Sequence, residues 1–179
     1  FFAGALSACI VITCAYLIFT NTLDTRESLI HGMFQAISIT TTTGFATQDF
    51  ASWPTFLPAM LLFFSFMGGC VGSTGGGIKA MRLMLIYKQG MRELKQLVHP
   101  QAVIPLKVGQ RRVPATVVSA VWSFFAVYMF SFIIILMLLM ATGLDFRTAF
   151  SAVAASLNNL GPGLGGVAAH YGDTSETAK

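Results

Sequence analysis

Hydrophobic residues dominate two long stretches of the chain, 1–20 and 113–140, and polar residues interrupt the chain in a repeated order around them. A helix of about 20 apolar residues is roughly 30 Å long, which matches the hydrocarbon thickness of a bilayer. As a helix the stretch 113–140 would be about 42 Å long, so we expect it to tilt or to protrude from the membrane. Both stretches are therefore predicted to be membrane-spanning helices.

A short apolar segment follows each predicted span after a polar loop. These segments, 31–41 and 146–157, are too short to cross a membrane. Each leads directly into a motif of polar residues and glycine, TTTTGFA at 40–46 and NNLGPG at 158–163. The motifs align when Gly44 is matched with Gly161. We interpret the short segments as re-entrant pore helices that dip into the membrane and return to the same side.

An exit helix follows the first motif. Pro54 and Pro58 favour a helix start, because proline is tolerated in a first helical turn. The chain then stays apolar through Phe66 and meets the glycine-rich stretch GGCVGSTGGG at 68–77, which is a poor helix former. A basic, amphipathic helix is predicted from Ile78 to about Val98.

Prolines and a glycine make 98–112 a turn-rich linker between the two units. The sequence thus predicts a first pore repeat at 1–97, a cytoplasmic linker at 98–112 and a second pore repeat at 113–179 that lacks its exit helix. The chain opens without methionine and stops soon after the second motif. We expect it to be a piece of a longer protein.

Composition supports a membrane location. The chain is 55% hydrophobic and 10% charged, with a mean hydropathy of +0.71, whereas soluble proteins carry about 25% charged residues. Lipid forces backbone polar groups to pair internally, and the apolar stretches lack the alternation of a transmembrane barrel. The expected fold class is all-α and integral to the membrane, with repeats of span, re-entrant pore helix, filter loop and span.

Charge predicts the orientation of the chain. Cytoplasmic loops collect lysine and arginine, so we place 79–112 in the cytoplasm and 21–53 and 145–179 on the other side. A surface that docks a partner can coexist with this role. Of the eleven basic residues, the eight within 79–112 are Lys79, Arg82, Lys88, Arg92, Lys95, Lys107, Arg111 and Arg112.

The two polar-glycine motifs have the chemistry of an ion path. Backbone carbonyls at membrane depth can replace the hydration shell of an alkali cation, and the C-terminal end of the preceding helix carries partial negative charge. Glycine permits the φ values that such a segment needs. Neither motif contains a carboxylate, since Asp49 lies beyond Gly44. A single motif of this kind is equally typical of an ordinary polar loop, but two copies favour a path for a monovalent cation.

The glycine-rich stretch 68–77 allows three interpretations. A phosphate-binding loop is disfavoured, because the sequence reads GGGIKA without the lysine–hydroxyl pair of a P-loop. A kink or a close-packing site is the structural alternative. The functional interpretation is a flexible intramembrane segment that obstructs or opens the path, with Ser73 and Thr74 lining it and Lys79 deterring cations when it is closed.

Several other residues are expected to have plain structural roles. His31 is read as the solvent-side start of the first pore helix, and Trp53 as an anchor at the membrane interface. Tyr128 is expected to need no special role. Asn158 and Asn159 are either helix C-cap residues or part of the filter, and their place in the repeat favours the filter. The cysteines Cys9, Cys14 and Cys70 lack the spacing of a metal site.

Three segments together resemble the third and fourth repeats of TrkH-type bacterial potassium uptake proteins, in the Trk/Ktr/HKT superfamily. These are ISITTTTGFATQDF, FMGGCVGSTGGGIKAMRL and SLNNLGPGLGGVAAHYGD. The resemblance implies four repeats around one pore, with one key glycine in each filter segment. It implies Gly44 and Gly161 as filter glycines, and 68–77 as a gating loop. The implied filter carbonyls belong to Thr42, Thr43, Phe45, Asn159, Leu160 and Pro162; the implied gating residues are Gly68, Gly69, Gly72, Ser73, Thr74, Gly75, Gly76, Gly77 and Lys79.

The resemblance also implies partners and a location. Proteins of this family work as homodimers in the bacterial inner membrane, as multi-pass proteins among membrane lipids, and a cytosolic ring of nucleotide-binding TrkA subunits regulates them. The expected function is potassium translocation, with potassium as substrate and with no resident cofactor of the chain's own. The first two repeats and the last exit helix are absent from this sequence, so ion preference is not fixed by it.

Other functions remain open at this point. The same fold can be sodium-permeable or a proton-coupled symporter, and His31 and Asp49 are the titratable residues near the first motif. The chain can also be a non-conducting membrane anchor or assembly subunit whose segment 79–112 docks a cytosolic protein. An intramembrane enzyme is disfavoured, because the sequence has no nucleophile–base pair and no HExxH-like set.

Overall fold

The computed structural model describes residues 1–54, 56–70, 72–73, 75–99, 101, 104–164 and 167. Its helices are α1 (Phe2–Phe19), α2 (Thr25–Thr40), η1 (Phe50–Ser52), α3 (Phe56–Ser65), α4 (Ala80–Val98), α5 (Ala115–Ala141) and α6 (Phe146–Leu157), and its strands are β1 (Lys107–Val108) and β2 (Arg111–Arg112). Helices α1 and α5 are long and apolar enough to cross a membrane, with mean hydropathies of 2.2 and 2.6. The predicted spans are thus found as helices.

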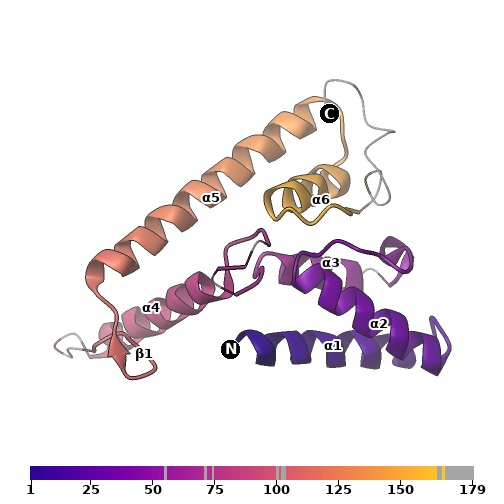
Figure 1. The fold of residues 1–179 in the computed structure, drawn as a ribbon. Helices are drawn as coiled ribbons and strands as arrows, with labels where there is room; N and C mark the ends of the chain where they lie inside the picture. The colour runs from indigo at the N-terminus through magenta and orange to yellow at the C-terminus, as the bar shows by residue number, and fades with distance from the viewer. Residues whose placement is uncertain are drawn as a thin grey trace.

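The chain contains two similar helix pairs. In each pair a long helix is followed by a shorter helix that folds back beside it. Helix α2 packs along α1, and α6 lies beside the upper end of α5 (Figure 1). Helix α3 packs against α1, α2 and α6, so it joins the two units. Helices α4 and α5 diverge from the β1–β2 hairpin, where they meet (Figure 1).

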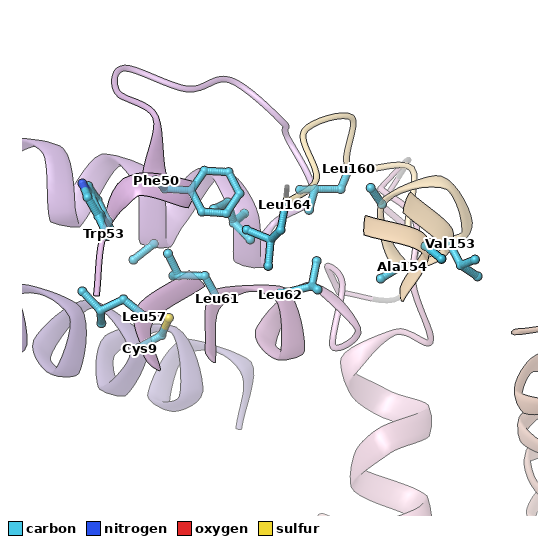
Figure 2. Packing of buried hydrophobic residues seen from close by; sticks show 14 of the residues in the cluster. Cys9, Phe50, Trp53, Leu57, Leu61, Leu62, Val153, Ala154, Leu160 and Leu164 are labelled. Atoms are coloured by element: carbon cyan, nitrogen blue, oxygen red, sulfur yellow. The ribbon is translucent and has the colours of Figure 1, made fainter. Parts of the chain in front are cut away.

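Apolar side chains from both units form one main cluster around α3. Leu57 and Leu61 are fully buried there, and Figure 2 shows Leu62 of the same helix pointing toward the loop residue Leu160. In a bilayer such side chains stabilise the fold through close van der Waals packing, because lipid tails are as apolar as leucine. Helix α5, in contrast, leaves Val127 and Phe130 66% exposed, as expected of a surface that faces lipid.

The first of the two short helices begins earlier than its apolar stretch suggested. Helix α2 starts at Thr25, with Asp24 as its N-cap residue and Glu27 in its first turn. Acidic and hydroxyl residues suit a helix N-terminus, so this polar turn belongs to the helix and not to the loop. The prediction that His31 starts the helix is therefore wrong. Helix α6 keeps its predicted bounds, and the Asp145 side chain accepts a hydrogen bond from Thr148 N at 3.2 Å.

The linker has a feature beyond the predictions, and one further prediction needs correction. The fold is mostly helical, but the linker contains a small antiparallel hairpin that pairs Lys107 with Arg112. A two-residue turn with Gly109 at φ +60 allows this pairing.

Trp53 is not an interface anchor. It is 4% exposed, because the turn η1, capped by the Asp49 side chain on Ala51 N at 3.0 Å, folds the chain back onto α3.

Candidate ion-filter site

The first candidate filter segment begins where α2 ends. Thr41 is the C-cap residue, and the next two residues bond back into the last turn: Thr42 N donates to Ile39 O at 3.1 Å and Thr43 N donates to Ser38 O at 2.8 Å. This pair of bonds is the Schellman arrangement of a helix C-terminus, which requires a left-handed residue. That residue is Thr42, with φ +56.

The second candidate segment repeats this geometry after α6. Asn158 is the C-cap residue, Asn159 N donates to Ser156 O at 3.1 Å and Leu160 N donates to Ala155 O at 2.8 Å. Asn159 has φ +53. In both segments a glycine with positive φ follows two residues after the left-handed residue, Gly44 at +83 and Gly161 at +95. The repeat seen in the sequence is therefore also a repeat of backbone conformation.

The two segments touch each other. A Cβ atom on Gly44 would overlap the carbonyl oxygen of Leu160 and lie 3.7 Å from Pro162 Cδ, so no other residue fits there. The Leu160 side chain is 2% exposed and anchored in the apolar cluster, which fixes the position of its carbonyl. A Cβ on Gly161 would meet nothing within 4 Å. At Gly161 the requirement for glycine is therefore one of backbone conformation alone.

Not every predicted filter carbonyl is in the same environment. The carbonyl of Phe45 accepts a hydrogen bond from Ser38 Oγ at 2.6 Å, which ties the end of the first segment to α2. The Thr43 hydroxyl lies 2.8 Å from the Thr41 hydroxyl, on an exposed part of the segment. Beyond the filter, Gln35 Nε2 donates to Gln48 O at 2.7 Å and holds the returning chain against α2.

The glycine-rich loop lies against both segments. Gly76 N donates to the Thr42 hydroxyl at 3.1 Å, and a Cβ on Gly75 would lie 3.1 Å from the carbonyl oxygen of Thr41. A Cβ on Gly76 would overlap the carbonyl of Asn158, the cap residue of the second segment. The absence of side chains at Gly75 and Gly76 thus permits the close approach of this loop to both helix ends.

Lysine and backbone bonds hold the loop in place. The Lys79 ammonium donates to Ser73 O at 3.0 Å, to Ser73 Oγ at 3.2 Å and to Gly75 O. Ile78 N donates to Phe66 O at 3.0 Å, which closes the loop at its base. Several glycines have the positive φ values that L residues disfavour; these are Gly68, Gly72 and Gly77. Thr74, which the sequence also assigned to this loop, lies outside the described residues.

A buried hydrogen-bond chain that the sequence did not predict supports the second segment. Asn158 is fully buried, its Nδ2 donates to Ser65 Oγ at 2.9 Å, and its Oδ1 accepts from Tyr128 Oη at 2.7 Å. Ser65 Oγ in turn donates to Leu62 O at 2.6 Å. The predicted absence of a role for Tyr128 is therefore wrong. The available signal was the phenol itself, because a tyrosine hydroxyl that packs against other helices usually has a partner.

The electrostatics of the site come from neutral oxygen atoms. Within the described ranges no group of three His, Cys, Asp or Glu side chains is placed to hold a metal ion. At the N-terminal end of α6, hydrogen bonds from Thr148 lower the pKa of Asp145, so this carboxylate is charged at neutral pH. His31 Nδ1 lies 3.0 Å from the Thr47 hydroxyl. Carbonyl and hydroxyl oxygens without carboxylates suit a large monovalent cation better than a divalent one.

A protein family and several known proteins match most of the chain. The TrkH cation transport protein family matches residues 9–179. The chain is 58% identical to the Trk system potassium uptake protein TrkH of Vibrio parahaemolyticus over 147 residues, which cover 82% of the chain and 30% of that protein. It is 46% identical to TrkH of Escherichia coli K12, over 99% of the chain and 37% of that protein.

A solved structure agrees with these relatives. The crystal structure of the potassium transporter TrkH from Vibrio parahaemolyticus superposes with a TM-score of 0.90 at 49% identity, over 97% of this chain and 37% of that one. The chain thus spans about a third of the length of the relatives that it matches. The resemblance noted in the sequence and the helical membrane fold are confirmed.

This relationship bears on two expectations, the location of the chain in the membrane and the class of protein to which it belongs. As a homologue of Trk potassium uptake proteins, the chain is an integral, multi-pass protein of the inner membrane, and the family consists of transporters and not of enzymes. The chain belongs to the TrkH family of cation transport proteins.

Proposed function

We propose that the chain supplies two of the filter segments of a potassium-translocating pore in the inner membrane. In this proposal a potassium ion gives up part of its hydration shell to backbone carbonyls of 42–45 and 159–162, and moves down its electrochemical gradient. The other filter segments come from parts of the protein outside this chain. The parts 1–97, 98–112 and 113–179 are proposed as one pore repeat, a cytoplasmic linker and a second pore repeat.

The observation that carries the proposal is the matched backbone of the two segments. Both follow a short helix, both place a left-handed residue after the cap, and both place a positive-φ glycine two residues later. Alternation in the sign of φ lets neighbouring carbonyls face one side, as a carbonyl-lined filter needs. The helices end at the segments, so their negative ends favour a cation there. An ordinary polar loop has no reason to repeat these features twice.

The loop 68–77 is proposed as the gate of this pore. Its contacts with Thr42 and with the Asn158 carbonyl support this role. These residues begin the two candidate filter segments, so a loop that contacts both is placed to block the ion path beneath them. In the closed state Lys79 holds the loop through the carbonyls of Ser73 and Gly75 and repels cations that approach from the cytoplasm. Opening requires these bonds to break.

Partners are proposed from the relatives. The names of the relatives describe Trk system potassium uptake proteins, and we propose that the full protein likewise transports potassium as a homodimer and is regulated by a cytosolic, nucleotide-binding TrkA-type subunit. The basic segment 79–112 is the part of this chain available for such a contact on the cytoplasmic side.

Tracer rubidium uptake by the full-length protein in liposomes tests the proposal. We expect uptake that potassium blocks and lithium barely affects. Equal competition by sodium would instead favour a sodium-permeable pore, and uptake that follows an imposed pH gradient without a voltage would favour proton coupling. A folded protein that takes up no rubidium with its cytosolic partner present would overturn the proposal in favour of an anchor or assembly role.

A further inference from the structure

A second polar site lies far from the filter, where α4, α5 and the linker meet. A cavity of about 390 Å³ opens between these elements, a size typical of small-ligand pockets. Its polar lining includes the side chains of Gln89 and Arg92 from α4, Arg112 from β2 and Ser119 from α5. Figure 1 shows α4 and α5 converging here, beside the β1–β2 hairpin.

The polar groups of this cavity are incompletely paired within the protein. Gln89 is 7% exposed, its Nε2 donates to Glu93 Oε1, and its Oε1 has no partner among the described residues. The Arg92 Nε atom is also buried without a partner there, although Arg92 Nη2 lies 3.7 Å from Glu93 Oε1. Buried polar atoms are nearly always hydrogen-bonded. One donor and one acceptor beside the cavity therefore lack a partner among the described residues.

The other wall of the cavity is apolar. Val113, Val118 and Trp122 line it, and Val118 packs in a small cluster with Leu85 and Leu106 at the base. Trp122 is 40% exposed, a position typical of an indole at the level of lipid headgroups. By the positive-inside rule we place this end of α5, which begins at Ala115, at the cytoplasmic side of the membrane. The cavity is thus amphipathic and lies at the membrane interface.

We propose that this cavity binds the headgroup of an anionic glycerophospholipid of the phosphatidylglycerol type. The guanidinium groups of Arg92 and Arg112 bind the phosphate, because arginine donates to phosphate oxygens in a bidentate manner. A free headgroup hydroxyl donates to Gln89 Oε1, which turns from its buried position toward the cavity when the lipid binds. The apolar wall carries the start of the acyl chains, which continue along the exposed apolar surface of α5. Basic pockets between helices on the cytoplasmic side are suited to such headgroups.

Native mass spectrometry of the full-length protein in a neutral detergent tests the site. Phosphatidylglycerol is titrated against the wild type and against Arg92→Gln and Arg112→Gln, with Arg111→Gln as the matched control, because Arg111 is the neighbouring arginine that does not line the cavity. We expect each cavity variant to bind phosphatidylglycerol about five-fold more weakly and the control to bind it like the wild type. Ser119→Leu, which fills the cavity without a change in charge, should weaken binding as well.

Two added ligands distinguish the source of the phosphate. Phosphatidylcholine, with the same acyl chains but a zwitterionic headgroup, should be retained less than phosphatidylglycerol, and soluble glycerol phosphate should not displace the lipid. Equal retention of both lipids, equal weakening by Arg111→Gln, or full displacement by glycerol phosphate would each overturn the proposal. None of these measurements depends on ion transport, so their outcome is separate from that of the proposed function.

Discussion

The phenol oxygen of Tyr128 in α5 lies 2.7 Å from the side-chain oxygen of Asn158, the residue that ends α6. The amide nitrogen of Asn158 donates to Ser65 Oγ at 2.9 Å, at the last residue of α3. These bonds join the long helix α5, the first residue of the second candidate filter segment, and helix α3, which leads into the glycine-rich loop. In the first segment the cap hydroxyl of Thr41 bonds to Ile37 O at 2.7 Å in its own helix, and the Thr42 hydroxyl accepts from Gly76 N of the glycine-rich loop.

Tyr128→Phe should destabilise the protein without a change in packing volume. The variant leaves Asn158 Oδ1 buried without a donor, which costs about 1–3 kcal/mol of unfolding free energy. The measurement is thermal unfolding of the full-length protein in detergent. Tyr87→Phe is the control, because Tyr87 is 63% exposed and its hydroxyl is free to contact solvent. A Tyr128→Phe variant as stable as the control would contradict the tether.

Substitutions of Thr42 test the contact between the first candidate filter segment and the glycine-rich loop. Thr42 combines a strained backbone with a hydrogen bond to that loop. A β-branched residue at φ +56 is disfavoured, and its hydroxyl accepts the Gly76 N–H at 3.1 Å. Thr42→Gly removes this acceptor, so we expect basal rubidium flux to rise by about two- to ten-fold, as loss of one hydrogen bond predicts. Thr42→Ser keeps the hydroxyl and should stay near the wild-type flux. Equal flux in the two variants would contradict a latch at this residue.

Lys79 provides a test of the gate that is independent of the filter. Lys79→Met removes the ammonium that binds Ser73 O and Gly75 O, so the loop should open more readily and basal rubidium flux should rise. The matched control is Lys88→Met, because Lys88 also donates to a backbone carbonyl, that of Lys107 at 2.8 Å, but in the linker. If both variants raise flux alike, the effect is one of surface charge and the proposed role of Lys79 is wrong.

Acid should weaken the start of α6. Hydrogen bonds from Thr148 lower the pKa of Asp145 in the folded protein, so this carboxylate stabilises the fold above the unfolded pKa of about 3.9. That contribution is lost as the pH falls through the folded pKa. The stability of the wild type relative to Asp145→Asn should therefore be constant near neutral pH and should shrink below about pH 4. A difference that grows on acidification would contradict the N-cap assignment.

Much of the helical frame was predictable because hydrophobic pattern and caps agreed. The bounds of α6 follow from Asp145 at its start and from the Asn158–Asn159 pair at its end. The two polar-glycine motifs were recognisable because each follows a short apolar segment and contains a glycine, and both glycines, Gly44 and Gly161, have positive φ. The sequence predicted the structure correctly where cap residues and glycines determine the local backbone conformation.

The features that the sequence did not predict depend on contacts between distant residues or on polar helix ends. The bond between Asn158 and Ser65 joins residues from different repeats. Trp53 is buried because η1 turns the chain inward. The first turn of α2 is polar, so the apolar pattern alone placed its start too late.

Gly161→Ser, compared with Gly143→Ser, tests the filter assignment most directly. Both glycines have positive φ, +95 and +91, and a Cβ on either would meet nothing within 4 Å, so both substitutions carry a similar conformational cost of about 1–2 kcal/mol. Gly161 lies in the proposed filter, whereas Gly143 lies in the turn between α5 and α6. The measurement is rubidium uptake by the full-length variants in liposomes, with potassium, sodium or lithium as competitor.

We predict that Gly161→Ser lowers the preference for potassium over sodium by about ten-fold, which corresponds to about 1.4 kcal/mol, while Gly143→Ser keeps the wild-type preference. An unchanged order and strength of competition in a folded Gly161→Ser protein would contradict a filter at this residue, and an equal loss in both variants would assign the effect to general destabilisation.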